Sequence, residues 1–181
     1  MIPSLLTFTL LAGLFLLALG LPFLINPGRM ETGTRSFPRH RLAGVVTMLL
    51  GGGWFLWKIT QLGPSDFGDY KHLLFMLFAA VLIGSIFYVR DFLAVRGVSI
   101  LVLLTANVGL KSAYGLYDTP ARLVLVAILY LLIVAALVYG TMPYKARDTI
   151  NWLYARPPRI RGVGLLCSAM GAVLLLSALL Y

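Results

Sequence analysis

Long apolar runs dominate the chain and are separated by short polar connections. A bilayer core about 30 Å thick requires roughly 20 residues of apolar helix. Six stretches meet this requirement and predict transmembrane helices over residues 2–25, 42–62, 72–89, 97–117, 122–142 and 162–181. No stretch alternates apolar and polar residues as the strands of a membrane barrel do. The pattern therefore predicts an all-α, polytopic integral membrane bundle, with a single transmembrane domain over residues 1–181.

The first apolar stretch could also be a secretory signal peptide. Ala18-Leu19-Gly20 resembles a cleavage site, but no Lys or Arg precedes the apolar run, as a signal peptide would require. The run also continues for five residues beyond that site, to Ile25. We therefore expect a retained first helix.

The composition agrees with a membrane protein. Hydrophobic residues make up 60% of the chain and charged residues 12%, and the mean hydropathy is +0.93. Soluble domains have about 45–50% apolar and about 25% charged residues. The chain has too little polar surface for a soluble enzyme, a disordered segment or a free-standing nucleic-acid-binding protein, despite its net charge of +9.

The basic residues predict how the chain crosses the membrane. Eleven of the 15 Lys and Arg residues fall in three alternate connections, residues 26–41, 90–96 and 143–161. The opposite connections offer only Lys71 and Arg122. Cytoplasmic loops carry an excess of Lys and Arg, so the three basic connections should be cytoplasmic and both termini outside the cytoplasm. The expected location is the cell (inner) membrane, with several passes.

The connection over residues 143–161 is long enough for structure of its own. Ile150, Leu153 and Tyr154 fall on one helical face, with Trp152 adjacent and basic residues around them. This pattern is typical of a short helix lying in the membrane interface. The alternative is an ordinary loop whose arginines meet anionic lipid.

Two parts of the sequence repeat each other. Residues 38–44 and 158–164 share the pattern P-R-x-R-x-x-G, and Gly51 matches Gly171 at the same offset. The repeat predicts three helical hairpins in one orientation, with an internal duplication of the first and last. The alternative is that membrane boundaries favour Arg and Gly in any chain.

The candidate site is centred on two lysines within predicted spans, Lys58 and Lys111. They lie about 24 Å and about 21 Å along their helices, counted from the cytoplasmic ends. Each belongs to a polar stripe on one helix face. The stripes comprise Trp54, Lys58 and Gln61 on the second predicted helix and Asn107, Lys111, Tyr114 and Asp118 on the fourth. If they face each other, they form a pocket that opens outward, with Asp66, Asp69 and His72 at its mouth.

The alternative is that both lysines snorkel to the headgroups beside an aromatic belt. Asn107 fits this alternative least, because its side chain has no long apolar stem. A pocket with two ammonium groups among aromatic rings would suit an anionic or carbonyl-bearing amphiphile, such as a lipid headgroup, a quinone or a small organic anion.

The sequence lacks the residue patterns that several kinds of catalytic and metal-binding site require. All six carboxylates map to connections or helix ends, His40 and His72 lie on opposite sides, and Cys167 is the single cysteine. No metal-ligand spacing, phosphate-binding loop or nucleophile elbow is present. We therefore expect no catalytic residue, no metal, no cofactor and no nucleic-acid partner.

These patterns favour a non-catalytic subunit or scaffold of a membrane complex, with membrane lipids and other membrane protein subunits as its partners. The alternative function is a small transporter, a channel, or a lipid- or quinone-binding protein that uses the outward pocket between residues 42–62 and 97–117.

Overall fold

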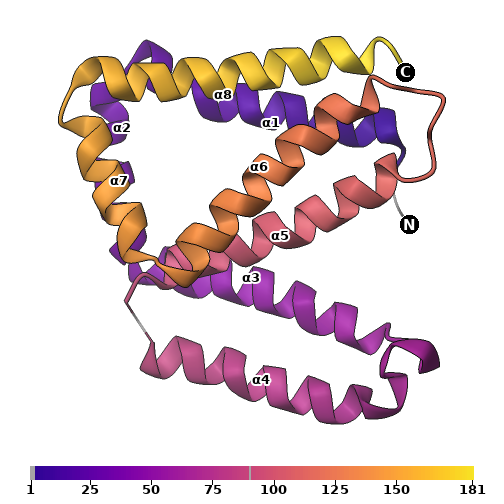
Figure 1. Ribbon diagram of the computed structural model, residues 1–181. Coiled ribbons are helices and arrows are strands. Elements are labelled where there is room, and N and C mark those ends of the chain that lie inside the picture. The colour runs from indigo at the N-terminus through magenta and orange to yellow at the C-terminus, as the bar shows by residue number, and fades with distance from the viewer. Residues whose placement is uncertain (1–2, 90) are drawn as a thin grey trace. The chain divides into compact units, whose positions relative to one another are not determined.

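A computed structural model describes residues 3–89 and 91–181 (Figure 1). Ile2, predicted to begin the first helix, and Arg90, counted among the cytoplasmic basic residues, lie outside the described residues. The described chain forms α1 (Leu5–Ile25), α2 (Pro27–Ser36), α3 (Arg41–Thr60), α4 (Lys71–Tyr88), α5 (Leu93–Ala113), α6 (Arg122–Thr141), α7 (Tyr144–Tyr154) and α8 (Pro157–Ala178). Three short 3-10 helices are η1 (Phe37–Arg39), η2 (Pro64–Asp66) and η3 (Gly68–Tyr70).

Six of these helices are long and apolar enough to cross a membrane: α1, α3, α4, α5, α6 and α8. They have 18 to 22 residues each. At about 1.5 Å per residue they measure roughly 27–33 Å, which matches the hydrocarbon core of a bilayer. The structure thus confirms an all-helical chain with six candidate membrane spans, as expected of a multi-pass membrane protein.

Two helices begin four or five residues earlier than the hydropathy pattern predicts. Helix α5 starts at Leu93 and ends at Ala113, since Gly115 adopts a left-handed φ of 81° just beyond it. The Arg122 guanidinium donates a hydrogen bond of 2.7 Å to the Ala113 carbonyl and so caps this helix end. Helix α8 starts at Pro157, because proline lacks the backbone N–H that would be unpaired at the first helical position.

The described chain divides into two compact units. Unit 1 comprises Met1–Arg35, Thr105–Ala135 and Arg147–Tyr181, and unit 2 comprises Ser36–Leu104 and Ala136–Ala146. Helices α5, α6 and α7 therefore contribute residues to both units, and Ser36 at the end of α2 belongs to unit 2.

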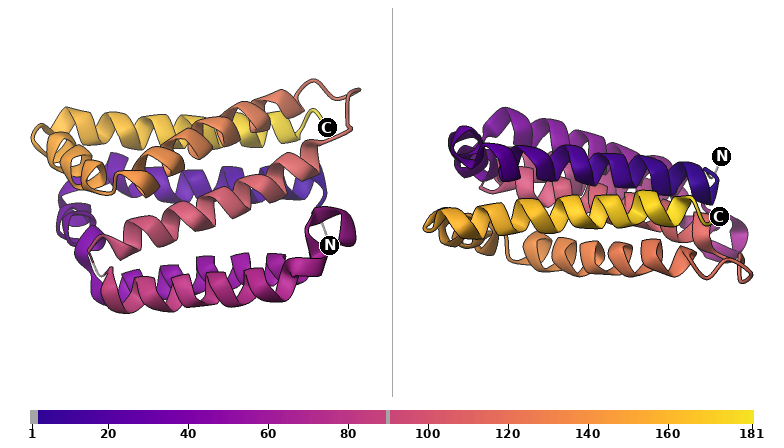
Figure 2. Two further views of the ribbon diagram at one scale, coloured as in Figure 1. Left: turned by 60° about the horizontal axis from the view of Figure 1, so that its bottom comes forward. Right: turned by 90° about the horizontal axis from the view of Figure 1, so that it is seen from above.

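Unit 1 is built on the antiparallel pair α1 and α8, which lie side by side in Figures 1 and 2. Their backbones meet at glycines: a Cβ added to Gly171 would lie 2.7 Å from the Gly13 carbonyl oxygen. A Cβ added to Gly20 would lie 2.7 Å from the Ser168 backbone nitrogen. Such small-residue faces let membrane helices approach closely. Leu174 of α8 is fully buried in the core of this unit.

In unit 2, α3 packs against α4 and α5. It runs antiparallel to α4, where the Phe55 and Phe78 rings meet edge to face with centroids 5.0 Å apart. It runs parallel to α5, because Gly44 contacts Leu93 near the start of α5 and Gly51 contacts Ile100 two turns later. Gly44 and Gly51 thus lie where α3 packs against α5.

The glycines of the sequence repeat all lie at helix contacts. Gly44 and Gly51 contact the parallel helix α5, whereas Gly164 and Gly171 contact the antiparallel helix α1. The shared spacing thus supports close packing in both units, although the direction of the neighbouring helix differs. The hairpin arrangement and the duplication stay predictions.

Candidate functional site

The first half of the predicted pocket lies in unit 2, at the end of α3. Lys58 occupies the last turn of α3, about 26 Å from its start. Its side chain is half-buried, as is that of Trp54, and its ammonium nitrogen lies 5.1 Å from the centroid of the Trp57 ring. Gln61 follows the helix, and its backbone N–H donates to the carbonyls of Lys58 and Ile59.

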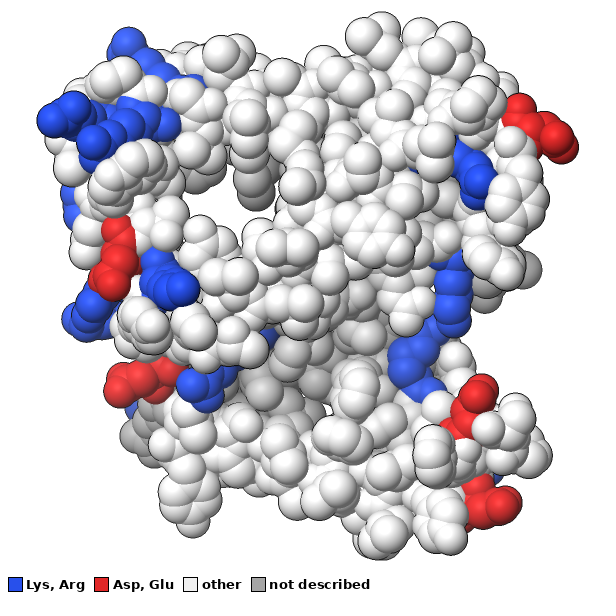
Figure 3. Space-filling model, viewed as in Figure 1, with Lys and Arg blue, Asp and Glu red and all other residues white. Residues whose placement is uncertain are grey.

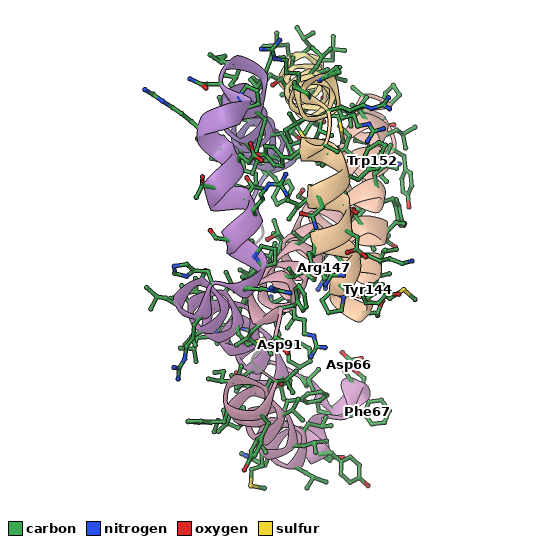
Figure 4. All side chains as sticks on the ribbon, turned by 90° about the vertical axis from the view of Figure 1, so that its left-hand side faces the viewer. Asp66, Phe67, Asp91, Tyr144, Arg147 and Trp152 are labelled. Atoms are coloured by element: carbon green, nitrogen blue, oxygen red, sulfur yellow. The ribbon has the colours of Figure 1, made fainter. Side chains whose placement is uncertain are left out.

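The predicted mouth residues lie in the connection after α3 and at the start of α4. Asp66 belongs to η2, Asp69 to η3 and His72 to α4, and all three side chains are exposed. Figure 4 labels Asp66 beside Phe67 in this connection. Among the described residues, neither carboxylate forms an ion pair with Lys58.

The second half of the predicted pocket lies in unit 1. Asn107, Lys111, Tyr114 and Asp118 are all exposed. Counted from Leu93, Asn107 lies about 21 Å and Lys111 about 27 Å along α5. No described residue forms a hydrogen bond with either side chain. Because the two stripes belong to different units, a pocket shared by Lys58 and Lys111 stays a prediction.

Each lysine lies at the end of its helix, and this position alone accounts for its charge. Each stands in the last turn of its helix, where a cation interacts favourably with the helix dipole. A lysine so close to a helix end also needs only a short reach to headgroup level. These positions at the helix ends are compatible with snorkelling and do not require a ligand.

In unit 1, side chains of α2 and of the part of α7 that begins at Arg147 form a polar layer. Arg35 of α2 donates a 2.7 Å hydrogen bond to the side-chain oxygen of Asn151 on α7, and its guanidinium lies 5.3 Å from the centroid of the Tyr154 ring. Arg35 also forms a 2.8 Å ion pair with Glu31 within α2. The Tyr154 and Thr34 hydroxyls lie 3.3 Å apart and join the same helices.

Helix α7 confirms the predicted helix in the connection over residues 143–161. Helix α2 was not predicted, although two sequence signals point to it. Pro27 stands at its first position, which proline favours, and Glu31 and Arg35 have the i, i+4 spacing of a helical ion pair.

Basic side chains gather where α7 meets α8, as Figure 3 shows. Arg159 donates a 3.0 Å hydrogen bond to the Trp152 carbonyl, and its guanidinium lies 4.1 Å from the centroid of the Trp152 ring. Figure 4 shows Tyr144 and Trp152 toward opposite ends of α7. The contacts between the Trp152 ring and the Arg159 guanidinium thus fix the corner between α7 and α8.

Sequence reasoning missed a cavity in unit 2. The cavity has a volume of about 330 Å³ and lies between α3, α5 and α6; its lining residues are Met48, Arg96, Ser99, Ile100, Leu103, Ala136, Leu137, Gly140 and Thr141. The prediction placed Arg96 in a cytoplasmic connection, whereas the structure places it in the first turn of α5. The apolar run Leu93-Ala94-Val95 before it was the signal that the helix begins earlier.

Within the described residues, no group of three or more His, Cys, Asp or Glu side chains could hold a metal ion. Comparisons with protein-family models, with curated proteins and with solved structures gave no match.

Proposed function

We propose that this chain is a non-catalytic subunit of a membrane protein complex and that α5 carries a contact surface for another membrane subunit. The observation that carries the proposal is the exposed side chain of Asn107, about 21 Å along an apolar helix. Lipid tails offer no hydrogen-bond partner to an amide. A neighbouring membrane helix does, and amide side chains commonly hydrogen-bond across such interfaces.

Lys111 and Tyr114 extend this surface toward the end of α5. Lys111 follows Asn107 at i+4, so these two side chains lie on one side of α5. Tyr114 is the first residue after α5, which ends at Ala113 and not at the predicted residue 117, and all three residues are exposed. We call them the Asn107 face. A partner that fits this face offers a hydrogen-bonding side chain at the depth of Asn107 and a carboxylate at the depth of Lys111.

The predicted orientation and hairpin arrangement belong to the same proposal. The uneven distribution of basic residues between alternate connections supports cytoplasmic basic loops and external termini. In this orientation the Asn107 face lies in the outer half of the bilayer. The glycine contacts between α1 and α8 support a rigid base on which such a face can be presented.

The test is co-purification in a mild detergent with two matched variants. Asn107→Leu removes the amide but keeps the size of the side chain. An interhelical hydrogen bond in a membrane contributes about 0.6–2 kcal/mol, so the substitution should weaken partner binding by roughly 3- to 30-fold. Thr105→Val is the control, because Thr105 is also exposed but lies about 160° away around the helix. Recovery of the wild-type chain as a monodisperse monomer without any partner would overturn the proposal.

A further inference from the structure

The cavity between α3, α5 and α6 combines apolar walls with one cationic group. Of its described lining residues, Arg96 alone is ionisable. Ser99 and Thr141 donate their hydroxyl hydrogens to carbonyls of their own helices, Val95 and Leu137. The volume of about 330 Å³ is within the usual range of small-molecule sites, about 300–1,000 Å³.

The Arg96 guanidinium has donor capacity that the described protein does not use. Its Nε atom is buried and has no hydrogen-bond partner among the described residues. No described carboxylate forms an ion pair with it. Guanidinium is permanently charged and carries five N–H donors, and a buried donor without an acceptor is unfavourable. The cavity therefore presents a cation that is suited to an anion from outside the chain.

Local contacts hold Arg96 at this position. The backbone N–H of Arg96 donates to the Phe92 carbonyl, 3.3 Å away, at the start of α5. Phe92 has a left-handed φ of 58°, and the Arg39 guanidinium lies 5.8 Å from the centroid of its ring. These contacts fix the start of α5 beside η1, and with it the backbone position of Arg96.

The layout of the cavity selects the chemistry of the anion. Arg96 lies about 4.5 Å from the start of α5, whereas Leu103 lies about 15 Å along it, near the middle of the helix. The charged group is thus near a membrane surface and the apolar walls extend toward mid-membrane. A phospholipid has the same arrangement: its charged phosphate lies near the membrane surface, and its apolar acyl chain extends toward mid-membrane. Guanidinium also binds phosphate oxygens in pairs, which fixes the geometry of the headgroup.

We propose that this cavity binds a phospholipid, with the headgroup phosphate on Arg96 and an acyl chain along Ile100 and Leu103. Basic pockets between transmembrane helices are known to hold lipid headgroups in this way. The predicted orientation places the site in the cytoplasmic leaflet. The inference does not depend on the partner proposed for the Asn107 face, which involves other residues.

Native mass spectrometry of the delipidated full-length chain in detergent tests this site. Phosphatidylglycerol should bind, whereas diacylglycerol with the same chains, which lacks the phosphate, should bind at least about tenfold more weakly. Arg96→Gln should weaken phosphatidylglycerol binding by a similar factor. Arg41→Gln is the matched control, because Arg41 is exposed at the start of α3 and does not line the cavity.

A second variant keeps the test decisive if Arg96→Gln fails to fold. Leu103→Trp leaves Arg96 in place but fills the apolar part of the cavity, so it should also lose phosphatidylglycerol. Equal binding of phosphatidylglycerol and diacylglycerol, or wild-type binding by either Arg96→Gln or Leu103→Trp, would overturn the proposal. Displacement of phosphatidylglycerol by millimolar inorganic phosphate would identify a free-anion site and would equally overturn it.

Discussion

The contact between α1 and α8 makes one glycine much less replaceable than its neighbour. A Cβ added to Gly164 would lie 2.7 Å from the Leu24 backbone nitrogen and 3.0 Å from the Gly20 carbonyl oxygen. These atoms belong to the backbone of α1, so they cannot rotate away and the two helices must separate. A Cβ added to Gly162, two residues earlier in α8, would meet no atom within 4 Å.

The pair Gly164→Ala and Gly162→Ala therefore isolates the cost of this contact. Both variants gain the same helix propensity, about 0.5–1 kcal/mol. Only Gly164→Ala adds overpacking, which costs about 1–3 kcal/mol. For a chain of this size each kcal/mol shifts Tm by about 2–4 °C, so Gly164→Ala should melt roughly 2–12 °C below Gly162→Ala.

The single cysteine provides the assay. Cys167 is half-buried in α8, so a thiol-reactive fluorogenic dye reports thermal unfolding of the detergent-solubilised chain. Wild type and both variants are heated under identical conditions. Equal Tm values for the two variants, or a higher Tm for Gly164→Ala, would refute the inference that the backbones of α1 and α8 meet at this glycine.

Three further predictions concern the connections and the lysines. Arg35→Gln should speed amide hydrogen exchange in α2 while leaving α8 unchanged, because it removes the contacts of Arg35 with Asn151 and Tyr154 and leaves only the hydroxyl contact between Thr34 and Tyr154. Unchanged exchange in α2 would contradict this. Lys58→Met and Lys111→Met should each lower Tm by no more than about 4 °C, because a last-turn lysine gains about 0.3–1 kcal/mol from the helix dipole. Loss of an anionic amphiphile by both variants would instead indicate one shared pocket. In a cysteine-free background, an impermeant maleimide added to intact cells should label Ser65→Cys, in a predicted external connection, but not Thr32→Cys, in a predicted cytoplasmic one. The reverse pattern would mean that the orientation is inverted.

The spans were predictable because hydropathy acts over about 20 residues and averages out local detail. The start of α5 was not, because Arg96 looks like a loop residue by charge alone. In the structure the apolar residues Leu93-Ala94-Val95 are buried, and they carry the helix back beyond the arginine. A charged residue at the edge of an apolar stretch can therefore belong either to a loop or to a helix that lines a cavity.

The candidate site illustrates a different limit. Helical spacing correctly places Asn107 and Lys111 one turn apart on α5, because i, i+4 geometry is local. Whether this stripe meets the one that contains Lys58 depends on how the helices pack. Helical periodicity identifies the residues of one helix face but does not say which other helix that face contacts. The cavity between α3, α5 and α6 was missed for the same reason, since its lining residues are up to 93 positions apart between Met48 and Thr141.

A photo-cross-linking amino acid at position 107 tests most directly whether α5 contacts another membrane subunit. The chain carries the cross-linker in its native membrane and is irradiated, and the products are separated by mass. We predict a product that is heavier than the 19.8 kDa chain and contains a second membrane protein, with a weaker or absent product from position 105. Adducts to lipid alone, or a product that contains only two copies of this chain, would contradict the proposed role as a subunit.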